Sequence, residues 1–62
     1  MITFATLAEE RGVHKNAIRA AARRYGMKWD KYPITKGGRR ASAFSIKDAA
    51  KFATLWAKEH GL

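Results

Sequence analysis

The chain has 62 residues, thirteen Lys and Arg against five Asp and Glu, a formal net charge of +8 and no cysteine. This length predicts one small domain over residues 1–62, and the lack of cysteine excludes disulfides and thiolate metal sites. No apolar run approaches the roughly 20 residues needed to cross a bilayer, and the first residues do not follow a signal-peptide pattern, so we expect a cytoplasmic protein with no membrane partner.

The excess positive charge is concentrated between Val13 and Ala43. This segment holds nine Lys or Arg residues against one acid, Asp30, whereas the rest of the chain holds four of each sign. A charge excess confined to one segment is the expected footprint for a polyanion such as nucleic acid. A basic surface that is merely solvated is the alternative, and it would tend to spread the charge.

The stretch from Thr3 to Gly26 predicts two short helices joined by a tight turn at Gly12-Val13. Thr3 can cap a first helix that begins at Phe4, although a capping box beginning at Thr6 would start it one turn later. A glycine at the turn can take the left-handed backbone conformation that ends many helices. Two helices joined in this way predict a helix-turn-helix.

The second helix is predicted to run from His14 or Lys15 to Tyr25, where Gly26 stops it. At about 100° per residue, Ile18, Ala21 and Tyr25 fall on one face and predict contact with the core. The other side carries the candidate DNA-reading residues. Arg pairs well with guanine and Asn with adenine, a small alanine leaves room in the groove and can touch a thymine methyl, and flanking cations suit phosphates. The candidates are Asn16, Arg19 and Arg23 for bases or adjacent backbone, Ala20 for close approach, and Lys15 and Arg24 for phosphates.

The next segment, from Gly26 to Ser45, predicts a β-hairpin. Trp29, Tyr32 and Ile34 supply the outgoing strand, a turn follows, and Ala41, Ala43 and Phe44 return. Pro33 fits such a sheet only on an edge strand. The glycines of the turn let the backbone come close to a duplex, and its basic residues bring charge to phosphates or into a narrow minor groove. The candidate DNA contacts of the turn are Lys36, Gly37, Gly38, Arg39 and Arg40. A flexible, solvated hairpin tip is the alternative.

Ser45 followed by Asp48 is a second capping pattern, and it opens an amphipathic helix that Gly61 ends. Its apolar stripe, together with two more aromatics, predicts the core: Phe4, Phe44, Ala49, Phe52, Ala53 and Trp56. Trp29 and Tyr32 either pack against the second helix or stack on nucleic-acid bases. The sequence offers no catalytic triad, no Walker-type loop and no metal-ligand cluster, so we expect neither an enzyme nor a cofactor, metal ion or small-molecule ligand.

Several of these motifs resemble the MerR-like winged-helix superfamily, which includes phage excisionases. The stretch TFATLAEERGVHKNAIRAAARRYG is similar to its first two helices, through Thr3, Leu7-Ala8, Gly12-Val13 and Ile18-Arg19. The resemblance extends to Gly38-Arg39-Arg40, Phe44-Ser45 and Asp48-Ala49, which are similar to the family's wing and third helix. It implies a mainly α fold with a β-hairpin, a winged helix-turn-helix. It also implies that Arg19 and either Arg39 or Arg40 meet the DNA backbone.

The expected function is sequence-specific binding of double-stranded DNA, as an excisionase-like recombination directionality factor or a small transcription regulator of a phage or mobile element. The resemblance implies an integrase and further copies of the chain, bound cooperatively at repeated sites, as partners. A DNA-recognition protein for phage packaging, similar to small terminase subunits, is one alternative. A small basic RNA-binding protein and a protein module that inhibits a host enzyme are the others.

Overall fold

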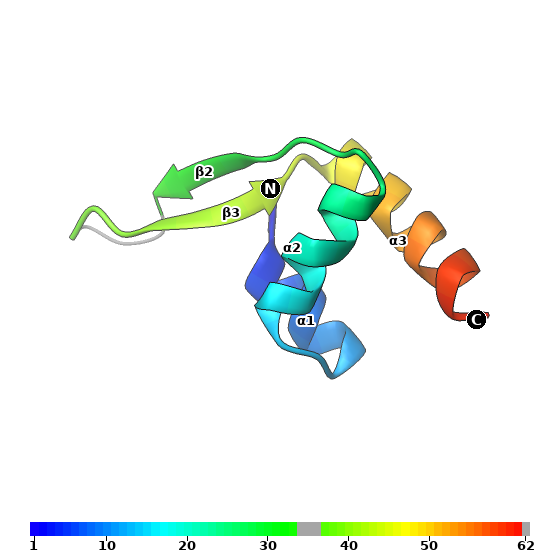
Figure 1. Cartoon of the computed structure of the whole chain (residues 1–62). Coiled ribbons are helices and arrows are strands. Elements are labelled where there is room, and N and C mark those ends of the chain that lie inside the picture. Colours follow the sequence, from blue (N-terminus) through cyan, green and yellow to red (C-terminus); the bar gives the residue numbers. More distant parts are fainter. Residues whose placement is uncertain (34–36, 62) are drawn as a thin grey trace.

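The computed structural model describes residues 1–33 and 37–61, which form three helices and a three-stranded antiparallel sheet. The elements follow in the order β1 (Ile2–Thr3), α1 (Phe4–Arg11), α2 (Lys15–Arg24), β2 (Asp30–Pro33), β3 (Arg40–Phe44) and α3 (Ile46–His60). The helices gather at one end, and the hairpin of β2 and β3 projects from them, so that the molecule measures 39 × 21 × 17 Å (Figure 1). This α+β arrangement agrees with the predicted helices and hairpin. None of the helices in the described part of the chain has both the length and the apolar character that a membrane crossing needs.

The first helix begins where its first capping residue predicts. The Thr3 hydroxyl accepts a hydrogen bond from the amide of Thr6 at 3.2 Å, which fixes the start at Phe4 and makes the alternative start one turn later wrong. At the other end Gly12 has a φ of 65°, and its amide bonds back to the last turn of α1. A residue with a side chain is strained at this φ, so glycine lets the chain turn directly into α2.

The second helix is capped by an unusual residue. The His14 ring accepts a hydrogen bond from the Asn16 amide at 3.1 Å through Nδ1, so histidine takes the role usually filled by serine, threonine or aspartate. The helix ends at Arg24, one residue before the predicted end. Ile18 and Ala21 are fully buried, as predicted, whereas Tyr25 is only partly buried.

The predicted hairpin is present, and it belongs to a larger sheet than the sequence indicated. β3 pairs with β2 on one side and with β1 on the other, giving the strand order β1-β3-β2. Pro33 lies on the edge strand β2, where a missing amide proton is tolerated. The prediction contained no third strand, because the two residues of β1 are too few to produce an alternating pattern. Ile34, expected on the outgoing strand, lies outside the described residues.

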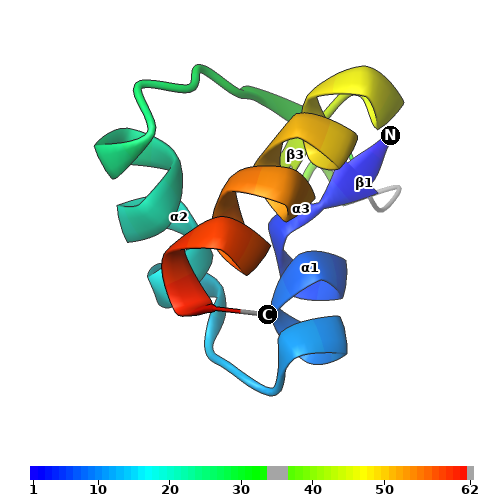
Figure 2. The ribbon, with the colours of Figure 1, turned by 90° about the vertical axis from the view of Figure 1, so that its right-hand side faces the viewer.

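The third helix covers the other two. The Ser45 hydroxyl accepts from the Asp48 amide at 3.1 Å, confirming the predicted cap, and Gly61 ends the helix with a φ of 69°. Figure 2 shows α3 lying across α1 and α2. Of the predicted stripe, Ala49, Phe52 and Trp56 are buried, while Ala53 is half-buried.

Aromatic rings connect these elements into one core. Ring centroids of Phe4 and Phe44 lie 4.9 Å apart, those of Phe44 and Phe52 5.6 Å apart, and those of Phe52 and Trp56 5.7 Å apart. This chain of rings runs from α1 through β3 into α3, so the four aromatic core predictions are confirmed. The full cluster also includes smaller apolar residues: Leu7, Ala8, Ile18, Ala21, Ala22, Met27 and Ala49.

Candidate nucleic-acid interface

The exposed surface of α2 divides into three parallel strips. At about 100° per residue, Lys15 and Arg19 lie on one side, Asn16 and Arg23 in the middle, and Ala20 and Arg24 on the other side. The structure assigns the two sides to different neighbours, since Lys15 and Arg19 line a hollow shared with the hairpin, and Ala20 and Arg24 line a groove shared with α1 and α3. The six residues predicted on one surface therefore occupy three environments.

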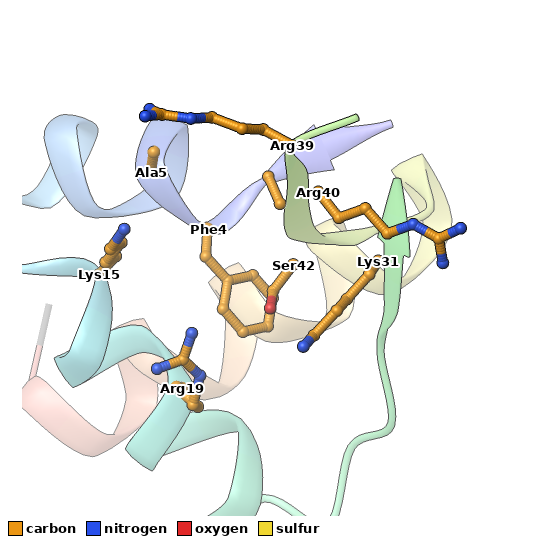
Figure 3. Close-up of a pocket in the computed structure, with 9 residues that line it drawn as sticks. Phe4, Ala5, Lys15, Arg19, Lys31, Arg39, Arg40 and Ser42 are labelled. Carbon is orange, nitrogen blue, oxygen red and sulfur yellow. The ribbon is translucent and has the colours of Figure 1, made fainter. Parts of the chain in front are cut away.

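The hollow beside the hairpin is strongly basic. It has a volume of about 340 Å³ and draws its walls from α1, α2, β2 and β3 together with Arg39, the last residue of the hairpin turn. In Figure 3 Lys15 and Arg19 extend from α2, and Lys31 extends from β2 toward Arg19. Arg39 and Arg40, where the chain enters β3, extend in opposite directions. We call this feature the basic hollow; its lining residues are Phe4, Ala5, Lys15, Arg19, Lys31, Arg39, Arg40, Ala41 and Ser42.

Among the residues that the structure describes, no Asp or Glu lines the basic hollow. The one acid of the basic segment, Asp30, lies on the opposite face of the hairpin, because neighbouring residues of a strand point to opposite faces and Lys31 faces the hollow. The Asp30 carboxylate accepts instead from the hydroxyl of Tyr32, on its own face, at 3.5 Å. The lining thus includes five cationic residues and no carboxylate, an arrangement that an anion would stabilise.

The floor of the basic hollow is closely packed. Phe4, 2% exposed, packs against Trp29 at 5.2 Å between ring centroids and against Phe44. Ser42 is 8% exposed, lies directly opposite Lys31 in the strand register, and is the only buried polar residue in residues 1–33 and 37–61. Its hydroxyl supplies a hydrogen-bond donor between the charged walls.

The groove on the other side of α2 has a different character. Its volume is about 450 Å³, and apolar residues make up most of its walls. The guanidinium of Arg11 lies 5.6 Å from the centre of the Phe52 ring and 5.9 Å from that of Trp56, and it donates to the Leu7 carbonyl at 3.1 Å. We call this feature the helix groove; it is lined by Arg11, Val13, Ala17, Ala20, Arg24, Trp56 and His60.

Arg24, predicted as a phosphate contact, is paired within the protein. Its guanidinium donates to the Glu59 carboxylate of α3 at 2.7 Å, the only ion pair within the described ranges 1–33 and 37–61. The nearby Tyr25 hydroxyl is buried without a well-formed hydrogen bond, and burial, followed by the Glu59 carboxylate, raises its pKa. In turn the Tyr25 hydroxyl and then Arg24 hold the pKa of Glu59 below its ordinary value. These contacts tie the end of α2 to α3.

The middle strip of α2 is open to solvent. Asn16 and Arg23 are both exposed, and the Asn16 side-chain oxygen accepts from the Arg19 guanidinium at 3.2 Å. The Arg23 guanidinium lies 6.0 Å from the centre of the Trp29 ring, which is itself partly buried. The contact with Trp29 orients Arg23 on the hairpin side of the strip.

The hairpin tip exposes three of its predicted contacts, Gly37, Gly38 and Arg39, and Arg40 is exposed at the start of β3. Gly38 has a φ of 78°, a conformation that residues with side chains rarely adopt. Lys36, the fifth predicted contact, lies outside the described residues.

Two polar residues of the basic hollow, Lys31 and Ser42, were not among the predicted DNA contacts. Both lie on the hairpin strands rather than at its tip, and which face they occupy depends on the strand register. The aromatics and Pro33 placed the strands only approximately. A fixed register would have identified the pair, because residues opposite each other share a face.

The described side chains include no group of three or more His, Asp or Glu residues that could hold a metal ion. The groups that this surface presents are the cations of the basic hollow, the Ser42 hydroxyl and the exposed side-chain amide of Asn16. Such groups can bind phosphates and the edges of bases. Comparison with protein-family models, with curated proteins and with solved structures finds no match to this chain, so its function is inferred from this geometry.

Proposed function

We propose that this protein binds double-stranded DNA sequence-specifically as a winged helix-turn-helix. In this proposal α1 and α2 form the helix-turn-helix, α2 enters the major groove, and the hairpin of β2 and β3 is the wing that meets the backbone or the minor groove. The observation that carries the proposal is the basic hollow, where cations from α2 and from the hairpin face one space with no acid in its lining.

The exposed middle strip of α2 supports base reading. Asn16 and Arg23 stand at its centre, and neither is held by a carboxylate in the described structure. Both side chains can pair bidentately with purine edges, and each good pair contributes about 1–3 kcal/mol of discrimination. The adjacent Ala20 is small and exposed, so it lets the helix approach the groove closely.

The partial burial of the aromatics favours DNA over single-stranded RNA. Proteins that bind single strands stack bases on open aromatic rings, whereas Trp29 is packed on Phe4 and beside Arg23. Tyr32 is also partly buried, on the face of the hairpin away from the basic hollow. A platform for successive bases would need these rings to be free.

Within DNA binding, we propose a role as an excisionase-like recombination directionality factor or a small transcription regulator of a phage or mobile element. Double-stranded DNA is the partner in both roles. A recombination directionality factor would also have an integrase and further copies of the chain, bound at repeated sites, as partners. The cations that line the basic hollow from both α2 and the hairpin support a protein that acts by occupying DNA. A role in recognising DNA for packaging is the alternative within this class.

A selection of bound duplexes from random sequence, followed by footprinting, tests the proposal. Enrichment of one motif is expected, with repeats at helical spacing for a cooperative factor and a single palindrome for a dimeric repressor. Competition between the selected duplex and single-stranded RNA should leave the duplex bound. Failure to enrich any duplex motif, or preferential binding of RNA, contradicts the proposal.

A further inference from the structure

We propose that the basic hollow is a specific seat for one backbone phosphate, with Ser42 and Lys31 as its central ligands and Arg19 beside them. The inference rests on the proposed function and deepens it, because it assigns two hairpin residues a defined chemical role. It also makes the strands of the hairpin, rather than only its tip, part of the interface. Its partner chemistry is a phosphodiester oxygen.

The walls of the basic hollow fit an anion and not a neutral ligand. A volume of about 340 Å³ is at the small end of the range for ligand pockets, but such pockets are mostly apolar with a few polar groups. Here the side walls carry Lys15 and Arg19 from α2 and Lys31 from β2 (Figure 3). Like charges held close together repel one another, and an anion between them replaces that repulsion by attraction.

The position of Ser42 favours a specific phosphate site over a diffuse basic surface. Ser42 places a hydroxyl on a strand whose two neighbouring positions hold the small apolar residues Ala41 and Ala43. A third alanine would suit this position if packing alone mattered. Instead the hydroxyl stands opposite Lys31 in the register, where a donor and a cation can meet the same oxyanion.

The floor makes the seat well defined. Phe4 is held by Trp29 on one side and Phe44 on the other, with tilted rings 5.2 and 4.9 Å away. Ser42 belongs to the central strand of the sheet, paired on its hairpin side with β2. Because the floor is packed and the walls come from α2 and β2, a phosphate seated here connects the helix to the hairpin.

A non-specific duplex of about 20 base pairs is a sufficient probe, because phosphate contacts do not depend on sequence. We expect Lys31→Met to weaken binding about tenfold and to lower the slope of log affinity against log salt by about one. Ser42→Ala should weaken binding about threefold with the slope unchanged, because it removes a hydrogen bond but no charge. Lys58→Met, which removes an exposed charge on α3 outside the basic hollow, is the matched control.

The double variant distinguishes one seat from two independent contacts. If Lys31 and Ser42 hold the same phosphate, the fold-loss of affinity in the double variant should be clearly smaller than the product of the two single fold-losses. The reason is that either substitution alone already weakens the contact to which the other residue contributes. Multiplication of the two losses, or single losses equal to that of the Lys58 control, overturns the inference. Thermal melting of each variant shows that the comparison is made between folded proteins.

Titration with inorganic phosphate separates this inference from the DNA-binding proposal. Amide resonances of Lys31, Ser42 and Arg19 should shift at millimolar phosphate and not with chloride at the same ionic strength, and Ser42→Ala should reduce the shifts. If the protein binds no duplex but these shifts appear, the DNA-binding proposal fails and the seat stands. If it binds duplex but the shifts are absent or spread over all basic residues, the seat fails and the DNA-binding proposal stands.

Discussion

The cations on the two sides of α2 have different partners. On the side of the helix groove, Arg11 lies over the rings of Phe52 and Trp56, and Arg24 is paired with Glu59. On the side of the basic hollow, the cations of α2 and of the hairpin face a space lined by no carboxylate in the described structure. The cations therefore make contacts that stabilise the fold on one side of α2, and on the other side they can bind an anion.

This difference shows why residue type alone cannot predict which basic residues contact DNA. Arg19 and Arg24 lie five residues apart on one helix, and the sequence predicted DNA contacts for both. Only the position of α3 decides that Arg24 has a carboxylate partner. If one side of α2 is structural and the other binds DNA, substitutions on the first should lower stability and substitutions on the second should lower DNA affinity.

Phe52→Ala should have the largest effect, and it acts on the structural side. The ring is fully buried and lies 5.5 Å from Tyr25 and 5.6 Å from Phe44, so its removal leaves a cavity between α2, β3 and α3. We expect a loss of about 3–5 kcal/mol in the free energy of unfolding, enough to unfold much of a domain this small. Urea denaturation followed by circular dichroism measures it. A loss under about 1 kcal/mol would mean that α3 is not essential to the core.

Arg11→Ala should destabilise the fold while leaving DNA affinity close to that of wild type. The substitution removes the packing of the guanidinium on two rings and its bond to the Leu7 carbonyl, for an expected loss of about 1–2 kcal/mol. Lys58→Ala controls for the lost charge. The division between the two sides is wrong if Arg11→Ala weakens DNA binding well beyond this control while the protein remains folded.

Arg19→Ala and Arg24→Ala form the direct comparison on α2. We expect Arg19→Ala to weaken duplex binding about tenfold, equivalent to about 1.4 kcal/mol, and Arg24→Ala to weaken it less than threefold. The reason is that phosphate must compete with Glu59 for Arg24 but with no carboxylate for Arg19. Fluorescence anisotropy with a labelled duplex measures both. Equal losses, or a larger loss at Arg24, would reverse the assignment.

The smallest effect is the acid titration of Glu59. Its pKa is lower in the fold than in the unfolded chain, chiefly through the Tyr25 hydroxyl and then Arg24, so its contribution is present above the unfolded pKa and is lost as pH falls through the folded pKa. Stability should therefore decline slightly through the acidic range, and Glu59→Gln should remove this part of the decline. Carboxyl resonances from NMR should give Glu59 a midpoint below that of glutamate in an unstructured peptide. A midpoint at the peptide value would contradict the contact.

Most of the secondary structure could be predicted because its boundaries are set by local chemistry. Thr3 and Ser45 cap their helices with side-chain oxygens, and Gly12 and Gly61 end them in the left-handed conformation. The strand β1 was missed because Ile2 and Thr3 pair with Phe44 and Ala43 at the far end of the hairpin, and such distant pairing leaves no local pattern.

The candidate site was predicted only in part, for the same physical reason. Charge and helical period identified Lys15, Asn16, Arg19 and Arg23, since both properties are local. They could not separate Arg24, whose partner Glu59 is contributed by another helix, or identify Lys31 and Ser42, whose shared face depends on the register of the hairpin. Partners from distant segments decide which charges remain available.

The position of Pro33 on β2 has a consequence for how copies of this chain meet. The outer side of an edge strand can template another strand, and such pairing leads to aggregation in many sheet proteins. Proline has no amide proton to offer, and Lys31 on the same short strand repels a second basic chain, so this edge resists extension by a neighbouring molecule. A concentrated solution should therefore remain free of β-sheet polymers, and any ordered array of copies would depend on a polyanion to offset their mutual repulsion.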